Sequence, residues 1–294
     1  MNDLANTHKI AAIVLSFSRE EDLKKVIFSL KNQTRELDEI IVIFQGTNPK
    51  ILEWLNAQTG ITVKQQGHIG SAGGFTSGLK MSIAKGYHWT WLLDDDAIPE
   101  LNALEEMTIC PYFDYKKTSL LSSVVMNPNR EVYMSPAAMN SNLWYGNVMQ
   151  DGCVPIYGSS WIGCLISSQS VIDFGLPVEE FFMYDEDAEF TSRVASQRSA
   201  YCVIKSIVIH YQKGSFDPFK NKVDMLKHGY YVRNHFALIR LSNNPAYVKL
   251  AKIWIWFFKN AFEIATRKVP FKTIISLMNG LIFFRPKIKP HTYD

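Results

Sequence analysis

The chain has 294 residues, of which 47% are hydrophobic and 20% charged, so a wholly disordered protein is excluded and one large or two small domains are possible. The net charge of +3 conceals two unlike parts. Residues 246–294 carry nine basic and two acidic residues, a net +7, whereas residues 1–245 carry 22 basic and 26 acidic residues, a net −4. We therefore expect the body and the tail to have different partners.

The cysteines and the apolar segments indicate a cytoplasmic protein. The chain has no C-x-x-C pair, which favours buried thiols in a reducing compartment over a zinc site or a disulfide framework. The cysteines are Cys110, Cys153, Cys164 and Cys202. The first nine residues are polar and the next apolar run is short, so no signal peptide is expected. No segment reaches the ~18 uninterrupted apolar residues of a membrane-spanning helix.

The first third of the chain has the alternating pattern of an α/β domain. Four apolar runs predict strands, at residues 10–17, 39–44, 61–65 and 87–93. A capping box at residues 18–21 predicts a helix after the first strand, and a glycine-rich passage at residues 67–74 leads into another near residues 78–84. This order predicts a Rossmann-like fold with a mostly parallel central sheet flanked by helices. Ligands bind beyond the carboxyl ends of such strands.

The rest of the chain is less regular. Further strands are predicted at residues 119–126, 156–167 and 201–209. Helices are predicted within residues 178–197 and at residues 223–241. A basic tail with helical spacing follows.

Three consecutive carboxylates, Asp94, Asp95 and Asp96, directly follow the fourth predicted strand. Their mutual repulsion is unfavourable at the end of an apolar strand unless a cation offsets it. Oxygen ligands suit Mg²⁺ or Mn²⁺, and Mg²⁺ is commonly shared between carboxylates and a substrate phosphate. A solvated acidic turn is the alternative for an isolated triplet, but the strand before it favours a metal site.

A second acidic cluster, Glu186, Asp187 and Glu189, follows an apolar lead-in at residues 181–184. On a helix, Glu189 and Arg193 would form an i,i+4 pair. A solvated helix start is one interpretation, because acids favour helix N-termini. A carboxylate held in a cleft by the lead-in would instead serve as a general base.

Two other features are ambiguous alone. His210 closes an apolar strand, and a lone histidine is more often structural, although a neutral imidazole can complete a Mn²⁺ shell beside carboxylates. The glycine-rich passage matches neither a P-loop nor G-x-G-x-x-G. It forms either a flexible loop or a backbone that can approach a diphosphate closely.

Taken in order, these motifs resemble the family 2 inverting glycosyltransferases with a GT-A fold, and among them the bacterial galactofuranosyl- and rhamnosyltransferases. The matching segments are residues 16–19, 33–34, 70–78, 94–96, 161–163, 181–193, 210 and 230–234. The resemblance implies a GT-A domain at residues 1–240, with a nucleotide-sugar half at about 1–126 and an acceptor and catalytic half at about 127–240. A basic amphipathic helical tail, residues 241–294, follows.

The resemblance also implies residue roles. Asp94 and Asp96 would bind Mn²⁺ or Mg²⁺, with His210 as a third ligand, and Asp187 would deprotonate the acceptor with Glu186 beside it. Nucleotide-sugar binding is implied for Ser16, Phe17, Arg19, Gly70, Gly73, Gly74, Asp94 and Asp95. Acceptor binding is implied for Trp161, as a platform for a sugar ring, and for Gly163 and Glu189.

The implied function is metal-dependent, inverting transfer of galactofuranose from UDP-galactofuranose to a surface polysaccharide or lipid-linked glycan. A rhamnosyltransferase using dTDP-rhamnose is the alternative within this class, and a sugar-binding module without catalysis is the alternative from another class. The family often carries Val-Asp-Asn after the second strand, with the Asp reading the base. Here Phe44-Gln45-Gly46 stands at that point, so the base remains open.

The tail predicts a membrane-surface element. Residues 248–267 place a narrow stripe of charged side chains, with Trp256 among them, between large apolar residues. Such a helix would lie at the inner face of the cell membrane, each cation contributing ~1 kcal/mol near an anionic leaflet. The alternative is a pair of helices packed on the core or on another subunit of a homo-oligomer. Nucleic acid is not expected, because the cations alternate with large aliphatic residues.

Overall fold

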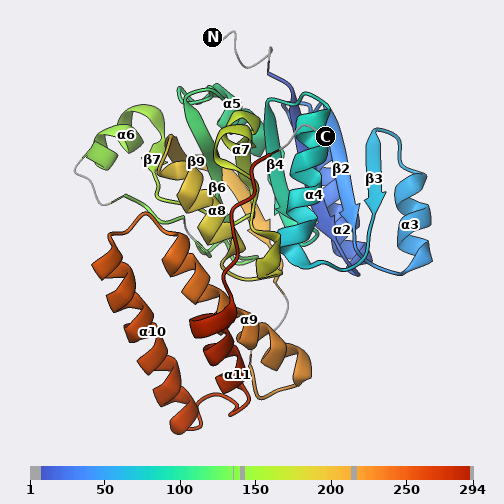
Figure 1. Cartoon of the computed structure of the whole chain (residues 1–294). Coiled ribbons are helices and arrows are strands. Elements are labelled where there is room, and N and C mark those ends of the chain that lie inside the picture. Colours follow the sequence, from blue (N-terminus) through green and yellow to red (C-terminus); the bar gives the residue numbers. More distant parts are fainter. Residues whose placement is uncertain (1–7, 135, 140–142, 213–216, 292–294) are drawn as a thin grey trace.

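The computed structural model describes residues 8–134, 136–139, 143–212 and 217–291, and its centre is a nine-stranded sheet (Figure 1). The strands are β1 Ile10–Ser16, β2 Glu39–Phe44, β3 Ile61–Gln65, β4 Trp89–Asp94, β5 Ala97–Pro99, β6 Thr118–Met126, β7 Cys153–Pro155, β8 Cys164–Ser167 and β9 Ser199–His210. The helices are α2 Glu20–Lys31, α3 Pro49–Asn56, α4 Gly70–Ala84, α5 Ala103–Ile109, α6 Leu143–Asp151, α7 Ser168–Phe174, α8 Glu186–Ala195, α9 Lys222–Leu241, α10 Ala246–Ala265 and α11 Thr273–Met278. A 3₁₀ turn, Glu179–Phe181, precedes α8, and a π-helical turn, Asn279–Phe283, continues α11.

The strand order is β3-β2-β1-β4-β8-β6-β9-β5, with β7 paired to β9. β1 runs parallel to both β2 and β4, and β2 runs parallel to β3. The chain therefore winds outward from β1 through β3 and then returns to place β4 on the other side of β1. In α/β sheets, ligands bind at such a switch point, beyond the carboxyl ends of the strands.

Helices cover both faces of the sheet, which explains the uninterrupted apolar runs of the strands. Ile10, Ala12 and Val14 of β1 pack in one cluster with α2, α3 and α5. Ala11 and Ile13 point to the other face, where they pack with α4, α7 and α8. The predicted α/β fold with its mostly parallel central sheet and flanking helices is confirmed.

Three local predictions were wrong. The capping box fails because α2 starts at Glu20 with Arg19 at its N-cap and no side-chain cap bond. The helix expected near residues 78–84 begins earlier, at Gly70 within the glycine-rich passage, and a Cβ at Gly78 would meet Ile13 of β1 at 2.6 Å, so Gly78 lets helix and strand approach closely. The run at residues 156–167 is a strand only from Cys164 onward.

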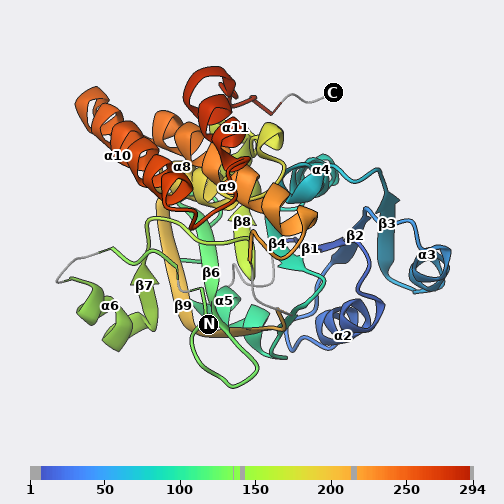
Figure 2. The ribbon, with the colours of Figure 1, turned by 90° about the horizontal axis from the view of Figure 1, so that it is seen from below.

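The C-terminal helices lie on the α4 and α8 side of the sheet (Figure 2). α10 and α11 pack on α9 around Val232, Trp256 and Leu277. Trp256 is only 8% exposed, and its Nε1 donates to the Val232 carbonyl at 3.1 Å, so the prediction that places it in the charged stripe of a membrane-surface helix is wrong. None of the described helices combines the length and hydropathy needed to cross a bilayer.

Candidate functional site

A pocket of about 310 Å³, here called the Asp94 pocket, opens at the carboxyl ends of β1 and β4. Its lining consists of Leu15, Ser16, Phe17, Ser18, Arg19, Gln45, His68, Gly70, Ser71, Asp94, Asp95 and Met183. Six of the residues predicted to bind a nucleotide-sugar are therefore brought together: Ser16, Phe17, Arg19, Gly70, Asp94 and Asp95. Five of them lie at or just after the ends of β1 and β4, which pair in parallel, and the sixth, Gly70, begins α4.

Asp95 fixes the loop after β1. Its carboxylate accepts hydrogen bonds from the Ser16 hydroxyl at 3.0 Å and from the Phe17 backbone N–H at 3.2 Å. The Arg19 guanidinium lies 2.9 Å from Asp95 and 2.7 Å from Asp96. Burial disfavours the charged guanidinium, but Asp96 and Asp95 outweigh it and raise the pKa of Arg19. Arg19 thus pairs with two of the three adjacent carboxylates.

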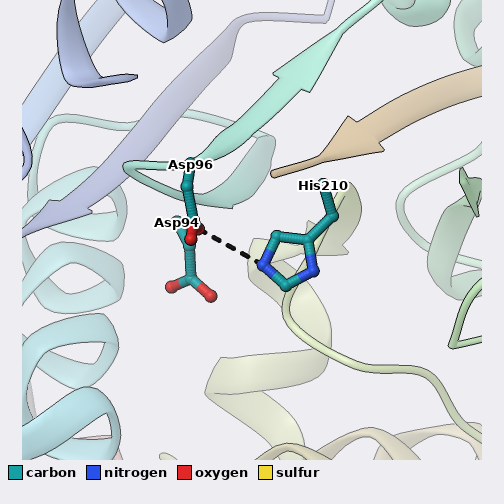
Figure 3. Close-up of side chains that lie close together, drawn as sticks. All are labelled: Asp94, Asp96 and His210. Atoms are coloured by element: carbon teal, nitrogen blue, oxygen red, sulfur yellow. Dashed lines mark ion pairs between the residues drawn. The ribbon is translucent and has the colours of Figure 1, made fainter. Parts of the chain in front are cut away.

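Asp94, Asp96 and His210 form a cluster in which one ligand atom from each lies within 4.8 Å of the others (Figure 3). The sheet register produces this meeting, because Ala97 of β5 pairs with His210 of β9. His210 Nε2 lies 3.3 Å from Asp96 Oδ1. Burial alone would raise the pKa of Asp96, but His210 and Arg19 lower it overall. Asp96 is therefore held as a carboxylate.

The chemistry of this cluster fits a divalent cation. Burial, followed by repulsion from Asp96 and Asp95, raises the pKa of Asp94 to about 7. Arg19 pairs with the two neighbouring acids, and no ion pair of Asp94 is found among the described residues. A cation at the cluster would favour the charged Asp94. Two carboxylates and an imidazole are suitable ligands for Mn²⁺, and carboxylates also suit Mg²⁺.

The second acidic cluster reaches the Asp94 pocket only through a contact of Glu186 with its lining. Glu186, 4% exposed at the start of α8, accepts a hydrogen bond from Ser71 of the pocket lining. Burial and the neighbouring Asp187 raise the pKa of Glu186 to about 8, and Asp94 also contributes to this rise. Asp187 is half-buried, and burial raises its pKa to about 6. At neutral pH Asp187 is therefore mostly a carboxylate and Glu186 mostly a neutral acid.

The segment before α8 has an unusual backbone. Phe182, Tyr184 and Asp185 have φ values of 67°, 68° and 64°, a region that non-glycine residues rarely occupy. Such conformations persist only where the surroundings enforce them, and they cluster at functional sites. Gly70, with φ of 76°, lies so close to the Phe182 carbonyl that a Cβ there would overlap it. The first turn of α4 and the segment before α8 thus pack so closely that only glycine has room at position 70.

Helix α9 holds the same segment from the other side. The Asn234 side chain, fully buried, donates to the carbonyls of Phe181 at 3.0 Å, Met183 at 2.8 Å and Tyr184 at 2.8 Å. His235 Nδ1 lies 3.2 Å from the Asp185 carboxylate. Asp185 is therefore engaged with α9, which separates it from the two acids that follow.

Asn234→Ala should remove these contacts and leave buried carbonyls unsatisfied. The Asn234 NH₂ has two N–H donors, which the three carbonyls share, so at ~1 kcal/mol for each donor we expect the free energy of unfolding to fall by ~2 kcal/mol. We also expect catalytic turnover (kcat) to fall at least tenfold, because Asp187 follows the released segment. Asn260→Ala is the control, since Asn260 is equally buried but donates only to Trp256. Urea unfolding and kcat on the folded protein should show that only Asn234→Ala affects turnover; equal kcat values would contradict the positioning role.

Several predicted residues lie away from the pocket. Trp161 is 4% exposed, with its ring between Phe75 at 5.2 Å and Phe190 at 5.5 Å, so it offers no open face and the acceptor-platform prediction was wrong. Glu189 forms the expected pair with Arg193 at 2.7 Å, but it is 3% exposed and serves packing.

Three predicted glycines also have packing roles. Gly163, with φ of 68°, would place a Cβ against Ser123. Gly73 contacts Ile69, and Gly74 lies against Gln45 and Leu15. None of these glycines lines the Asp94 pocket, so the predicted contacts of Gly73 and Gly74 with a donor, and of Gly163 with an acceptor, have no support in their surroundings.

The sequence did not identify Gln45, His68, Ser71, Met183 and Asn234 as site residues. Gln45 was noted only as a departure from the family pattern. Its Oε1 accepts from the Ile69 N–H and its Nε2 donates to the Gly70 carbonyl, both at 2.8 Å. Gln45 therefore fixes the start of α4, while the His68 ring lies 4.7 Å from that of Phe17.

Comparison with known proteins gives a consistent picture. Residues 11–109 match the family model described as Glycosyl transferase family 2. Galactofuranosyltransferase GlfT1 of Mycobacterium tuberculosis is 24% identical over 288 residues, covering 90% of this chain and 91% of the relative. GlfT1 of Mycolicibacterium smegmatis is 23% identical over 201 residues, covering 65% and 67%.

Solved structures share the fold. GalNAc-T7 with UDP, GalNAc and Mn²⁺ superposes with a TM-score of 0.64 at 11% identity over 80% of this chain, which spans 48% of the length of that protein. S. aureus TarS 1-349 in complex with UDP-GlcNAc gives a TM-score of 0.62 at 15% identity, covering 93% of this chain and 79% of the other. At these identities the likeness shows the fold alone.

Proposed function

Because the chain is a family 2 glycosyltransferase with the GT-A fold, we propose that it transfers galactofuranose from UDP-galactofuranose to a glycan acceptor, with inversion and with Mn²⁺ or Mg²⁺. The observation that carries the proposal is that Asp94, which belongs to the cluster with Asp96 and His210, lines the Asp94 pocket, while Glu186, the neighbour of Asp187, accepts a hydrogen bond from Ser71 of the same lining. The galactofuranosyltransferase relative that aligns over 90% of the chain supports the choice of sugar.

The chain's own residues take the following roles in this proposal. Asp94, Asp96 and His210 would hold the cation, which when bound would supply Lewis-acid stabilisation of negative charge on a diphosphate leaving group. Phe17 and Arg19 line the donor pocket, and Asp95 keeps their loop in place.

The acceptor proton goes to a carboxylate of the second cluster. Asp187 takes it, because its pKa of about 6 leaves it ionised at neutral pH. Glu186, with a pKa of about 8, stays neutral and so avoids adding a charge near Asp94.

Donor binding tests the proposal directly. The full chain with Mn²⁺ should be thermally stabilised more by UDP-galactofuranose than by dTDP-rhamnose, because binding to the folded state raises Tm. Stronger stabilisation by dTDP-rhamnose would favour the rhamnosyltransferase alternative. Binding without metal-dependent transfer to any glycan would favour a sugar-binding module.

We propose that the C-terminal helices contact the membrane at its inner face, where a lipid-linked glycan would be available. The outward side of α10 exposes apolar residues at helical spacing: Tyr247, Leu250, Trp254, Phe258 and Phe262. The basic excess of residues 246–294 complements an anionic surface. A stripe this apolar would otherwise be unfavourable in water.

Replacing Phe258 and Phe262 together by Asp should release the chain from anionic vesicles. Each ring is at least 60% exposed, so the substitutions should not disturb the core. Flotation with phosphatidylglycerol vesicles should show at least a tenfold lower bound fraction. Phe28→Asp is the matched control, because Phe28 is 67% exposed on α2, and it should leave binding unchanged. Equal flotation of both variants would rule out the α10 contact.

A further inference from the structure

A second pocket, of about 300 Å³, lies between α9 and α11 and is here called the α9–α11 pocket. Met225, Leu226 and Ile275 give it apolar walls, and Arg233 and Lys272 give it two positive charges. Its lining contains no carboxylate. The combination suits an amphiphile with an anionic group and an apolar chain, and the volume is that of a small-molecule site.

The two positively charged side chains of the pocket, Arg233 and Lys272, differ in mobility. The Arg233 guanidinium donates through Nη2 to the Glu180 and Phe181 carbonyls, both at 3.1 Å, so it provides a fixed charge. Lys272 is exposed at the pocket edge, so its ammonium can move to meet a ligand. A fixed and a mobile cation together can bind a phosphate from two sides.

Thr273 is an independent sign of a ligand. It lines the pocket and is 3% exposed, yet its hydroxyl has no hydrogen-bond partner in the part of the chain that the structure describes. A buried hydroxyl without a partner costs ~1–3 kcal/mol. A ligand oxygen that reaches this hydroxyl would accept the missing bond.

The pocket shares a wall with the Asp94 pocket. Tyr230 of its lining stacks on Phe182, with ring centroids 5.0 Å apart. The next residue, Met183, lines the Asp94 pocket. Ile275 of the lining is 69% exposed, and Phe271, the residue before Lys272 in the chain, is 74% exposed. One molecule could thus have its apolar end on the bundle and its other end near Asp187.

We propose that the α9–α11 pocket binds the phosphate-bearing end of the acceptor's lipid carrier. The proposal rests on the proposed function, because it requires a lipid-linked acceptor. The carrier phosphate lies between Arg233 and Lys272, its first apolar segment lies against Leu226 and Ile275, and the glycan extends past Tyr230 toward the Asp94 pocket.

Calorimetric titration of the full chain with decyl phosphate, below its micelle concentration, tests this binding. We expect Lys272→Glu to weaken it at least tenfold, and Thr273→Val to weaken it about threefold to tenfold without lowering Tm. Lys268→Glu, an exposed tail lysine outside the pocket lining, should change it less than twofold. Uncharged decyl maltoside and inorganic phosphate should each bind at least tenfold more weakly than decyl phosphate.

Three results would overturn the proposal: equal affinity for decyl maltoside, equal affinity for inorganic phosphate, or equal effects of Lys272→Glu and Lys268→Glu. Loss of flotation with phosphatidylglycerol vesicles in Lys272→Glu alone would also overturn it, since the pocket would then bind a bilayer headgroup. Titration of UDP in the presence of Mn²⁺ distinguishes failure of the carrier-site proposal from failure of the proposed function. Intact UDP binding without decyl phosphate binding contradicts only the carrier site, whereas loss of UDP binding in the unmodified chain contradicts the proposed function.

Discussion

Asp187→Asn should lower kcat for sugar transfer at least ~10³-fold, because general-base catalysis typically contributes ~10²–10⁴-fold and an amide cannot accept the proton. The substitution is nearly isosteric, and Asp187 does not line the Asp94 pocket, so UDP affinity should stay within twofold. Single-turnover transfer and calorimetric UDP binding on the same preparation provide the measurement. A residual rate within tenfold of the unmodified enzyme would exclude Asp187 as the base.

The neighbouring acid provides the matched variant. Glu186→Gln replaces a group that is mostly neutral at pH 7, since its pKa is about 8, and should cost less than tenfold in kcat. If Glu186→Gln caused the larger loss, the roles of the two residues would be reversed.

The pH profile gives a second check on the base. Because burial raises the pKa of Asp187 to about 6, its active carboxylate form is lost as the pH falls through 6. kcat should therefore rise with pH and level off above pH 7. A profile flat from pH 5 to 8 would contradict ionisation of Asp187 as the controlling step.

Asp94→Asn should abolish the effect of Mn²⁺ on UDP binding and lower transfer at least ~10³-fold, because it removes a charged ligand that the cation shares with the diphosphate. Asp94 is the best position for this test, since Asp95 and Asp96 also bind Arg19. Titration of UDP with and without Mn²⁺ measures the effect, and EDTA should impose the same loss on the unmodified chain. If Mn²⁺ still changed the UDP affinity of the variant, the assignment of Asp94 as a metal ligand would be wrong.

The melting temperature of Asp94→Asn distinguishes the loss of a metal ligand from misfolding of the variant. The folded-state pKa of Asp94, about 7, lies above its ordinary value, so the unfolded chain releases this proton first and the carboxylate destabilises the metal-free fold as the pH rises. Asp94→Asn removes that cost. The metal-free variant should therefore melt at a higher temperature than the unmodified chain at pH 8, and this difference should shrink toward pH 4.

Much of the structure of residues 1–126 could be predicted because the signals there are local. The apolar runs at residues 39–44 and 61–65 became β2 and β3 with the expected bounds. The residues after β1 and β4 meet because parallel strands end at one edge of the sheet. His210 could be linked to the acids only by family resemblance, since its approach depends on the pairing of the short strand β5 with β9.

The failures share a physical cause: they depend on tertiary packing. Trp161 resembles an exposed sugar platform in sequence, but its ring fills space between α4 and α8. Arg19 follows a capping signal, yet its guanidinium is drawn to Asp95 and Asp96. Asn234 gives no sign in the sequence that its amide serves three carbonyls some 50 positions earlier.

Helix α9 contacts two different parts of the molecule. On one side, its Asn234 holds the segment before Asp187. On the other side, Trp256 and Gly280 pack against it, and any larger residue at position 280 would collide with Phe236. Shortening the chain at residue 245 to obtain a minimal enzyme would therefore expose this second side of α9 to water. A more useful fragment would retain all three C-terminal helices and replace only the outward rings of α10 with polar residues.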